Sequence, residues 1–102
     1  MISLPRARGR GRGGAATLPK PITYSTHAEQ VMIERDLERA WIEAAIQNPD
    51  WTEPDPLDPA VERRFLAIPA REGRILRVAV TENDDTILVV TAFLDRNARR
   101  PA

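Results

Sequence analysis

Hydrophobic residues recur at helical spacing early in this sequence and at strand spacing in its second half. In residues 27–35 the apolar side chains share one helical face, with His27 at its edge and Arg35 near its centre. That face carries Ala28, Val31 and Met32. Thr26 and Glu29 have the spacing of a capping box, which predicts that the helix begins at His27.

A second helical pattern covers residues 38–48, and Pro49 ends it because the residue before a proline disfavours helical geometry. Only Asp36 and Leu37 separate the two helices, which predicts an αα-hairpin packed on a common core. The preceding residues 22–25 are β-forming and predict a short edge strand. After the second helix, residues 48–59 hold four prolines and three aspartates, which predicts an acidic loop anchored by Trp51.

From residue 62 onward the hydrophobic period changes to two. Residues 62–68, 74–82 and 86–95 are rich in β-branched and aromatic residues and are separated by turn-forming segments, so they predict three antiparallel strands in a meander. In the middle strand one face should meet the helices while the other shows Arg77, and the last strand should be central or covered on both faces. The predicted fold class is α+β: a short strand, an αα-hairpin and a three-stranded meander.

The charge distribution divides the chain into a basic tail and an acidic domain. Residues 1–20 carry five of the fifteen basic residues and no acidic one, so this Arg/Gly-rich segment has a charge of about +5 and is predicted to be disordered. Residues 21–102 form the single predicted domain, with ten basic and fifteen acidic residues. The tail therefore suits an electrostatic tether for RNA or DNA, or else a flexible extension with incidental charge.

Several classes of protein are excluded by what the sequence lacks. There is no cysteine, and one histidine cannot form a zinc motif or a two-histidine ribonuclease centre. No glycine-rich phosphate loop or Gly-x-Ser-x-Gly elbow occurs, and no apolar run reaches membrane-spanning length. We expect a cytoplasmic protein without a metal or cofactor.

His27 and nearby arginines are the candidate functional residues. Histidine most readily exchanges a proton near neutral pH, and the N-terminal end of a helix attracts anions, so His27 suits acid–base work on a bound phosphate. The alternative is a histidine that packs its ring at the edge of the core. Arg35 suits bidentate phosphate binding beside His27, or else it caps carbonyls or pairs with a carboxylate.

Arginines on the predicted strands are candidates for the same anion. Arg77 is expected on the open side of the sheet, and strand alternation puts either Arg63 or Arg64 there without deciding which. Thr91 is a candidate RNA contact, and its hydroxyl suits strand pairing and capping better than nucleophilic attack.

Four segments together resemble bacterial proteins of the family called domain of unknown function 4258. They are Tyr24-Ser25-Thr26-His27-Ala28 with Met32, Glu34 and Arg35; Asn48-Pro49-Asp50; Arg74-Ile75-Leu76-Arg77-Val78; and Val89-Val90-Thr91-Ala92-Phe93. The resemblance covers about residues 22–96, and the order of elements is similar to that of BrnT and RelE toxins, which cleave RNA without metal and are blocked by a cognate antitoxin.

The resemblance implies a toxin-like, metal-independent ribonuclease of a toxin–antitoxin system. It implies that His27 acts as an acid or base, that Arg35, Arg77 and Arg64 bind the scissile phosphate, and that a cognate antitoxin is the partner. Arg63 and Thr91 are further candidates for contacts with RNA. The acidic domain departs from the strongly basic character of such toxins. The alternatives are a non-catalytic RNA- or protein-binding module of the same fold and a structural partner in a larger complex.

Overall fold

The computed structural model describes residues 20–101. The predicted disordered tail therefore lies outside the described residues, except for Lys20. The ammonium of Lys20 donates to the carboxylate of Glu82 and to the carbonyl of Asn83, both at 2.7 Å. Lys20 thus contacts the folded domain, although the sequence assigned it to the tail.

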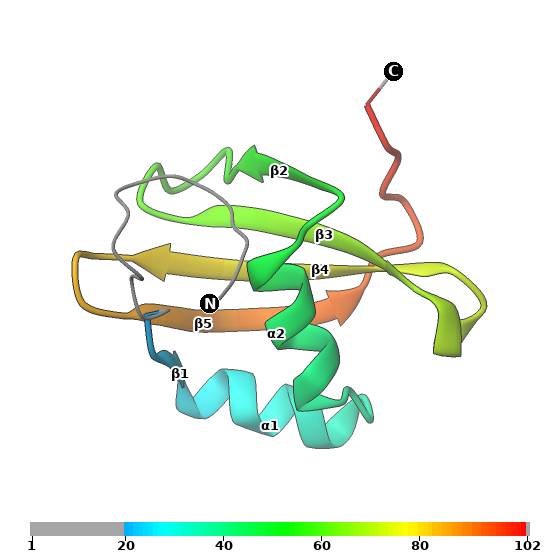
Figure 1. Ribbon diagram of the computed structural model, residues 1–102, viewed down its shortest axis with the longest axis horizontal. Coiled ribbons are helices and arrows are strands. Elements are labelled where there is room, and N and C mark those ends of the chain that lie inside the picture. Colours follow the sequence, from blue (N-terminus) through cyan, green and yellow to red (C-terminus); the bar gives the residue numbers. More distant parts are fainter. Residues whose placement is uncertain (1–19, 102) are drawn as a thin grey trace, which may run out of the picture.

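The fold is α+β, as predicted: a mixed five-stranded sheet and two α-helices (Figure 1). Across the sheet the strands run β1-β5-β4-β3-β2. Their bounds are β1 Ile22–Tyr24, β2 Trp51–Pro54, β3 Glu62–Ile68, β4 Arg74–Glu82 and β5 Ile87–Leu94. The helices are α1 Thr26–Glu34 and α2 Arg39–Gln47, and a 3₁₀ turn, η1, covers Pro69–Arg71.

The predicted meander is confirmed, because β3, β4 and β5 pair antiparallel in sequence order. The predicted N-terminal strand is also present as β1, which pairs parallel to β5 at one edge of the sheet. β5 consequently lies inside the sheet, between β1 and β4.

The prediction of a loop through residues 48–59 was wrong in part. Residues 51–54 form β2, which pairs antiparallel to β3 and makes the other edge of the sheet. The carboxylate of Asp50 accepts from the Ala67 amide at 2.9 Å, and the Asp50 amide donates to the Phe65 carbonyl at 2.7 Å. These bonds hold the start of β2 beside β3, and Pro54 is tolerated because β2 is an edge strand.

α1 begins one residue earlier than its capping box predicted. The side chain of Ser25, not Thr26, is the N-cap, and its hydroxyl accepts from the Ala28 amide at 3.0 Å. The same hydroxyl donates to the Val90 carbonyl of β5 at 3.0 Å. Ser25 is the N-cap because its hydroxyl forms hydrogen bonds with a helix amide and with a strand carbonyl at the same time.

The two helices pack mainly on the sheet and not on one another. α1 lies against β5 and β1, while α2 lies on β4 and β3, so the predicted αα-hairpin describes their connection better than their packing (Figure 1). The predicted break at Asp36 and Leu37 is present, with Asp36 in the left-handed region at φ 55°. The Leu37 amide donates to the Met32 carbonyl at 2.9 Å and closes the turn.

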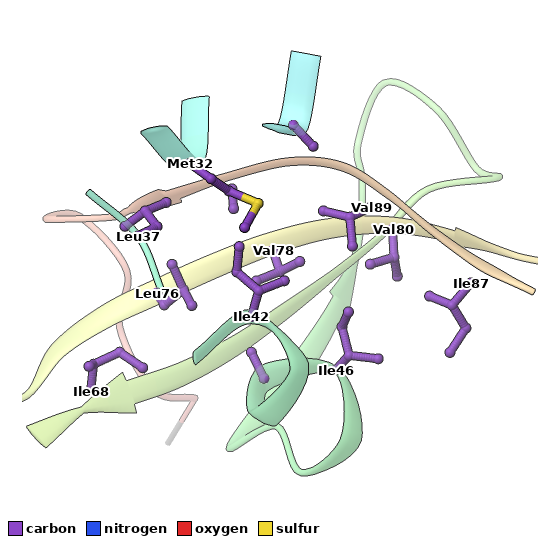
Figure 2. Close-up of a cluster of buried hydrophobic side chains, with 13 residues drawn as sticks. Met32, Leu37, Ile42, Ile46, Ile68, Leu76, Val78, Val80, Ile87 and Val89 are labelled. Carbon is purple, nitrogen blue, oxygen red and sulfur yellow. The ribbon is translucent and has the colours of Figure 1, made fainter. Parts of the chain in front are cut away.

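The core lies between the helices and one face of the sheet (Figure 2). Leu76, Val78 and Val80 alternate along β4 and are essentially fully buried, as the period of two predicted. They meet Met32 of α1 and Ile42 of α2. Within residues 20–101 no helix is long and apolar enough to span a bilayer.

Candidate functional site

The face of the sheet opposite the core carries a row of aromatic and arginine side chains. Strand register places Trp51 of β2, Phe65 of β3, Arg77 of β4 and Phe93 of β5 side by side. Trp51 and Phe65 stack with ring centroids 4.6 Å apart, and the guanidinium carbon of Arg77 lies 4.3 Å from the centroid of Phe93. We call this side of the sheet the open face. Arg77 lies on it, as predicted.

The next row of the open face carries Arg63 and Thr91, separated by Ala79 of β4. The carboxylate of Asp55 contacts Arg63 at 3.4 Å, and that of Asp95 contacts Arg77 at 3.4 Å. Burial and the neighbouring charge of Arg63 lower the pKa of Arg77, against the opposite influence of Asp95. Two cations therefore lie close together here, and each is partly neutralised by an acid.

Arg64 lies on the face that the helices cover, so Arg63 and not Arg64 is the arginine of β3 on the open face. Its guanidinium donates to the Ile46 carbonyl of α2 at 3.0 Å and to Glu62 and Glu82 at 2.7 and 2.8 Å. Burial alone lowers the pKa of Arg64, but the hydrogen bonds to both carboxylates outweigh burial, so the pKa is raised. These contacts tie α2 to β3 and β4, and they separate Arg64 from the other predicted site residues.

His27 lies in the first turn of α1 and contacts β5. Its Nε2 is 3.3 Å from the hydroxyl of Thr91, and the histidine is exposed. Thr91 shares the open face with Phe93, two residues further along β5. The structure thus brings His27 and Thr91 together at the rim of the face that bears Arg63 and Arg77.

Arg35 is not at the same end of the helix as His27. It is the C-cap of α1, eight residues after His27, so about 12 Å of helix separates the two positions. The Arg35 guanidinium donates to the Ala92 carbonyl at 3.0 Å, and its carbon lies 5.9 Å from the Phe93 centroid. The expectation that Arg35 and His27 hold one oxyanion at the helix N-terminus is therefore not met. Arg35 caps a carbonyl of β5, which is one of its alternative roles.

A second arginine cluster, which the sequence did not predict, surrounds Arg35. The β3–β4 connection brings Arg71 and Arg74 to the C-terminal turn of α1, and the three arginines line a pocket of ≈ 480 Å³. Its remaining lining residues are Leu37, Phe93 and Leu94. The proline and glycine of residues 69–73 signalled the turn, but no spacing rule connects that turn to α1.

The described residues contain no group of three histidine, cysteine, aspartate or glutamate side chains placed to hold a metal ion. The chemistry available at the open face is proton exchange at His27, hydrogen bonding by Thr91 and charge stabilisation by arginine.

Comparison with known proteins places the chain in a family. No curated protein and no solved structure matches it, so the similarity to BrnT and RelE toxins stays a prediction. A family model does match, over residues 24–94, and this range contains His27, Arg35, Arg77 and the arginine-lined pocket. The chain belongs to the family described as domain of unknown function (DUF4258), as its sequence segments predicted.

Proposed function

We propose that this domain is a toxin-like ribonuclease that cleaves RNA without a metal ion and is blocked by a cognate antitoxin. The observation that carries the proposal is the contact between His27 and Thr91 at the rim of the face that bears Arg63 and Arg77. A proton-exchanging side chain and two cations are a minimal set for cleaving a phosphodiester whose own 2′-hydroxyl attacks.

In the proposed reaction His27 takes the proton of the ribose 2′-hydroxyl, and the 2′-oxygen attacks the adjacent phosphorus. The bond from phosphorus to the 5′-oxygen breaks, and the imidazolium returns its proton to that oxygen. The products are a 2′,3′-cyclic phosphate and a 5′-hydroxyl. Thr91 orients the imidazole through its hydroxyl, 3.3 Å away, and Arg63 and Arg77 offset the negative charge of the phosphorane.

The dimensions of the face suit these roles. Thr91 and Arg63 are two strands apart, which corresponds to about 10 Å between their backbones. A phosphate between them lies within reach of a guanidinium side chain and of the imidazole at the rim. The half-buried ring of Trp51, on the edge strand β2, offers a surface on which an unpaired base can stack.

Purified protein and a fluorescent RNA with a single scissile region test the proposal. Wild type should cleave the RNA in the presence of a chelator and leave 2′,3′-cyclic phosphate ends. His27→Ala should lower the cleavage rate by about 10²-fold or more, the usual effect of removing a general acid–base group. Thr91→Val should have a smaller effect on the rate, because it removes an orienting contact and not the proton carrier.

Gln30→Ala is the matched control, because Gln30 is also exposed on α1 and pairs only with Glu34 of the same helix among the described residues. It should cleave RNA at the wild-type rate. Induced expression of wild type and of Gln30→Ala should arrest bacterial growth, whereas His27→Ala should not. Equal cleavage by wild type and a folded His27→Ala variant would remove the catalytic proposal.

The second candidate is a non-catalytic RNA-binding module. The acids beside the arginines favour it over a ribonuclease, because they weaken the stabilisation of a phosphorane but leave the Trp51 ring available to a base. Asp55 and Asp95 already occupy Arg63 and Arg77, so a phosphate must compete with two carboxylates. This candidate predicts that wild type and His27→Ala bind RNA with equal affinity and that neither cleaves it. Binding measured by fluorescence anisotropy, together with cleavage on the same RNA, separates the two candidates.

A further inference from the structure

We propose that the pocket lined by Arg35, Arg71 and Arg74 binds the phosphate of a nucleotide, with the attached organic part against Phe93 and Leu94. This pocket borders the open face, with which it shares Phe93, but its three arginines lie at the opposite end of α1 from His27. Its volume of ≈ 480 Å³ falls within the range of small-molecule sites. The inference depends on the proposed function only for the source of the nucleotide, which is a strand of RNA or a free mononucleotide.

Two of the three guanidiniums are held in place by backbone carbonyls. Arg35 donates to the Ala92 carbonyl at 3.0 Å, and Arg71 donates to the Asp36 carbonyl at 2.9 Å. Arg71 also lies over the ring of Trp41, with its guanidinium carbon 5.3 Å from the centroid. A guanidinium has five N–H donors, so these contacts orient the side chains and leave donors for a ligand.

The backbone around the pocket is built to bring the arginines together. Asp36 at φ 55° turns the chain after α1, and Glu72 and Gly73, at φ 62° and 77°, turn it between Arg71 and Arg74. The Gly73 amide donates to the Ile68 carbonyl at 2.9 Å and closes this second turn. Left-handed residues of this kind are costly unless the surrounding contacts fix them, so both turns hold defined positions.

The negative end of the α1 dipole corresponds to about half an elementary charge, so it offsets only a small part of the charge of three arginines. The last carbonyls of the helix already accept hydrogen bonds, because Val31 bonds to the Arg35 amide and Met32 to the Leu37 amide, both at 2.9 Å. Among residues 20–101, the acid within 4 Å of one of these guanidiniums is Asp36, whose carboxylate is 98% exposed and 3.8 Å from Arg71. Water screens such a long and exposed pair strongly.

Charge matching favours a phosphate over a carboxylate as the ligand. Three arginines converge on a pocket whose lining includes no acidic residue among those described. A carboxylate brings one negative charge, whereas a terminal phosphate brings close to two and three acceptor oxygens. The guanidinium fork also matches phosphate geometry. The half-buried side chains of Phe93 and Leu94 can contact the organic part of a nucleotide, whereas inorganic phosphate has no apolar part to contact them.

Nuclear magnetic resonance titration of the full chain tests the inference. Adenosine monophosphate should shift the amide signals of Leu37, Phe93 and Leu94, and it should bind more tightly than inorganic phosphate. Arg74→Gln should weaken binding by about tenfold, the effect of losing one charge-assisted hydrogen bond. Arg74 is exposed and makes no side-chain bond within residues 20–101, so this variant should keep its stability.

Arg100→Gln is the matched control. It removes the same charge from an exposed side chain that pairs with Asp50, away from the pocket lining, and should change the affinity less than twofold. Arg71→Lys provides a second variant, since it keeps the charge and loses the fork. If Arg74→Gln and Arg100→Gln bind alike, or if adenosine monophosphate shifts no pocket signals, the inference is wrong. Tighter binding of an acidic peptide would also overturn it.

Two further comparisons identify the source and keep the two proposals separate. A short single-stranded RNA that binds more tightly than the mononucleotide, and loses that advantage in Arg74→Gln, assigns the site to a strand. An advantage that Arg74→Gln keeps comes from other surfaces, and the pocket then belongs to free nucleotides. His27→Ala should bind adenosine monophosphate as well as wild type does. If wild type binds the mononucleotide in the pocket and cleaves no RNA, the ribonuclease proposal fails while this one stands.

Discussion

The neighbouring residues Arg63 and Arg64 should respond in opposite ways to the same substitution. Methionine keeps most of the apolar stem of either arginine and removes its charge. Arg64 faces α2, where its side chain is only 13% exposed and bonds to a helix carbonyl and two carboxylates. Arg63 lies on the open face with one carboxylate contact at 3.4 Å. Arg64→Met should therefore destabilise the fold, and Arg63→Met should mainly weaken RNA binding.

The contacts of Arg64 allow its contribution to stability to be worked out. Its loss leaves the Ile46 carbonyl, in the last turn of α2, without a donor, at a cost of about 1 kcal/mol. Glu62 and Glu82 are 46% and 37% exposed, so losing each of these screened pairs costs about 0.5–1 kcal/mol. The total is about 2–3 kcal/mol, which corresponds to a fall in Tm of roughly 10–20 °C for a domain of this size.

Differential scanning calorimetry measures the two Tm values, and fluorescence anisotropy at a temperature where both variants are folded measures RNA affinity. We expect a large fall in Tm for Arg64→Met and a much smaller one for Arg63→Met. RNA affinity should fall only for Arg63→Met. Similar Tm values for the two variants would refute the stabilising role of Arg64. Loss of RNA affinity in a folded Arg64→Met would mean that RNA does not bind at the open face.

Three further predictions concern the cap, an acid and the tail. Ser25→Ala should lower the free energy of unfolding by about 1–2 kcal/mol in a denaturant titration, since both the N-cap and the bond to Val90 are lost. Hydrogen bonds from Lys20 and from a guanidinium lower the pKa of Glu82, so its stabilising effect is present above about pH 4.5 and is lost as the pH falls through the lower folded pKa. Glu82→Gln should therefore flatten the fall in Tm over that acidic range. Removing residues 1–19, which include four arginines, should reduce the slope of log K against log salt for single-stranded RNA by up to about 3.

Hydrophobic periodicity predicted those parts of the fold in which the local sequence alone determines the secondary structure. The alternation of Leu76, Val78 and Val80 is enough to place Arg77 on the open face. Local rules were less accurate where tertiary contacts choose between options. Ser25 and Thr26 can both cap a helix, and the Val90 carbonyl decides between them. Residues 51–54 resemble a loop because their strand forms only by pairing with β3.

The sequence could identify candidate site residues but not group them. Arg71 and Arg74 flank the turn between β3 and β4, more than thirty residues after Arg35, and only the folded chain brings the three to one pocket. Equally, strand alternation restricts Arg63 and Arg64 to opposite faces but says nothing about which face the helices cover. Which face the helices cover depends on where α2 packs. The bond from Arg64 to the Ile46 carbonyl of α2 shows that α2 covers the face that bears Arg64.

α1 also protects an edge of the sheet, and this affects how its variants must be interpreted. β1 pairs with β5 only as far as Val89, so the rest of β5 has no strand on that side. Side chains of α1 and its caps bond to this stretch instead: Ser25 to the Val90 carbonyl and Arg35 to the Ala92 carbonyl. An unpaired strand edge is open to aggregation.

Loss of activity after substituting Arg35 therefore has two possible origins, a missing guanidinium or an exposed edge. His27 differs, because it contacts the Thr91 hydroxyl and no backbone group of the strand. Removing His27 should leave the carbonyls of β5 covered and the Tm close to that of wild type. A large fall in the Tm of His27→Ala would mean that the imidazole supports the packing of α1 on β5, and its loss of activity would then say nothing about proton transfer.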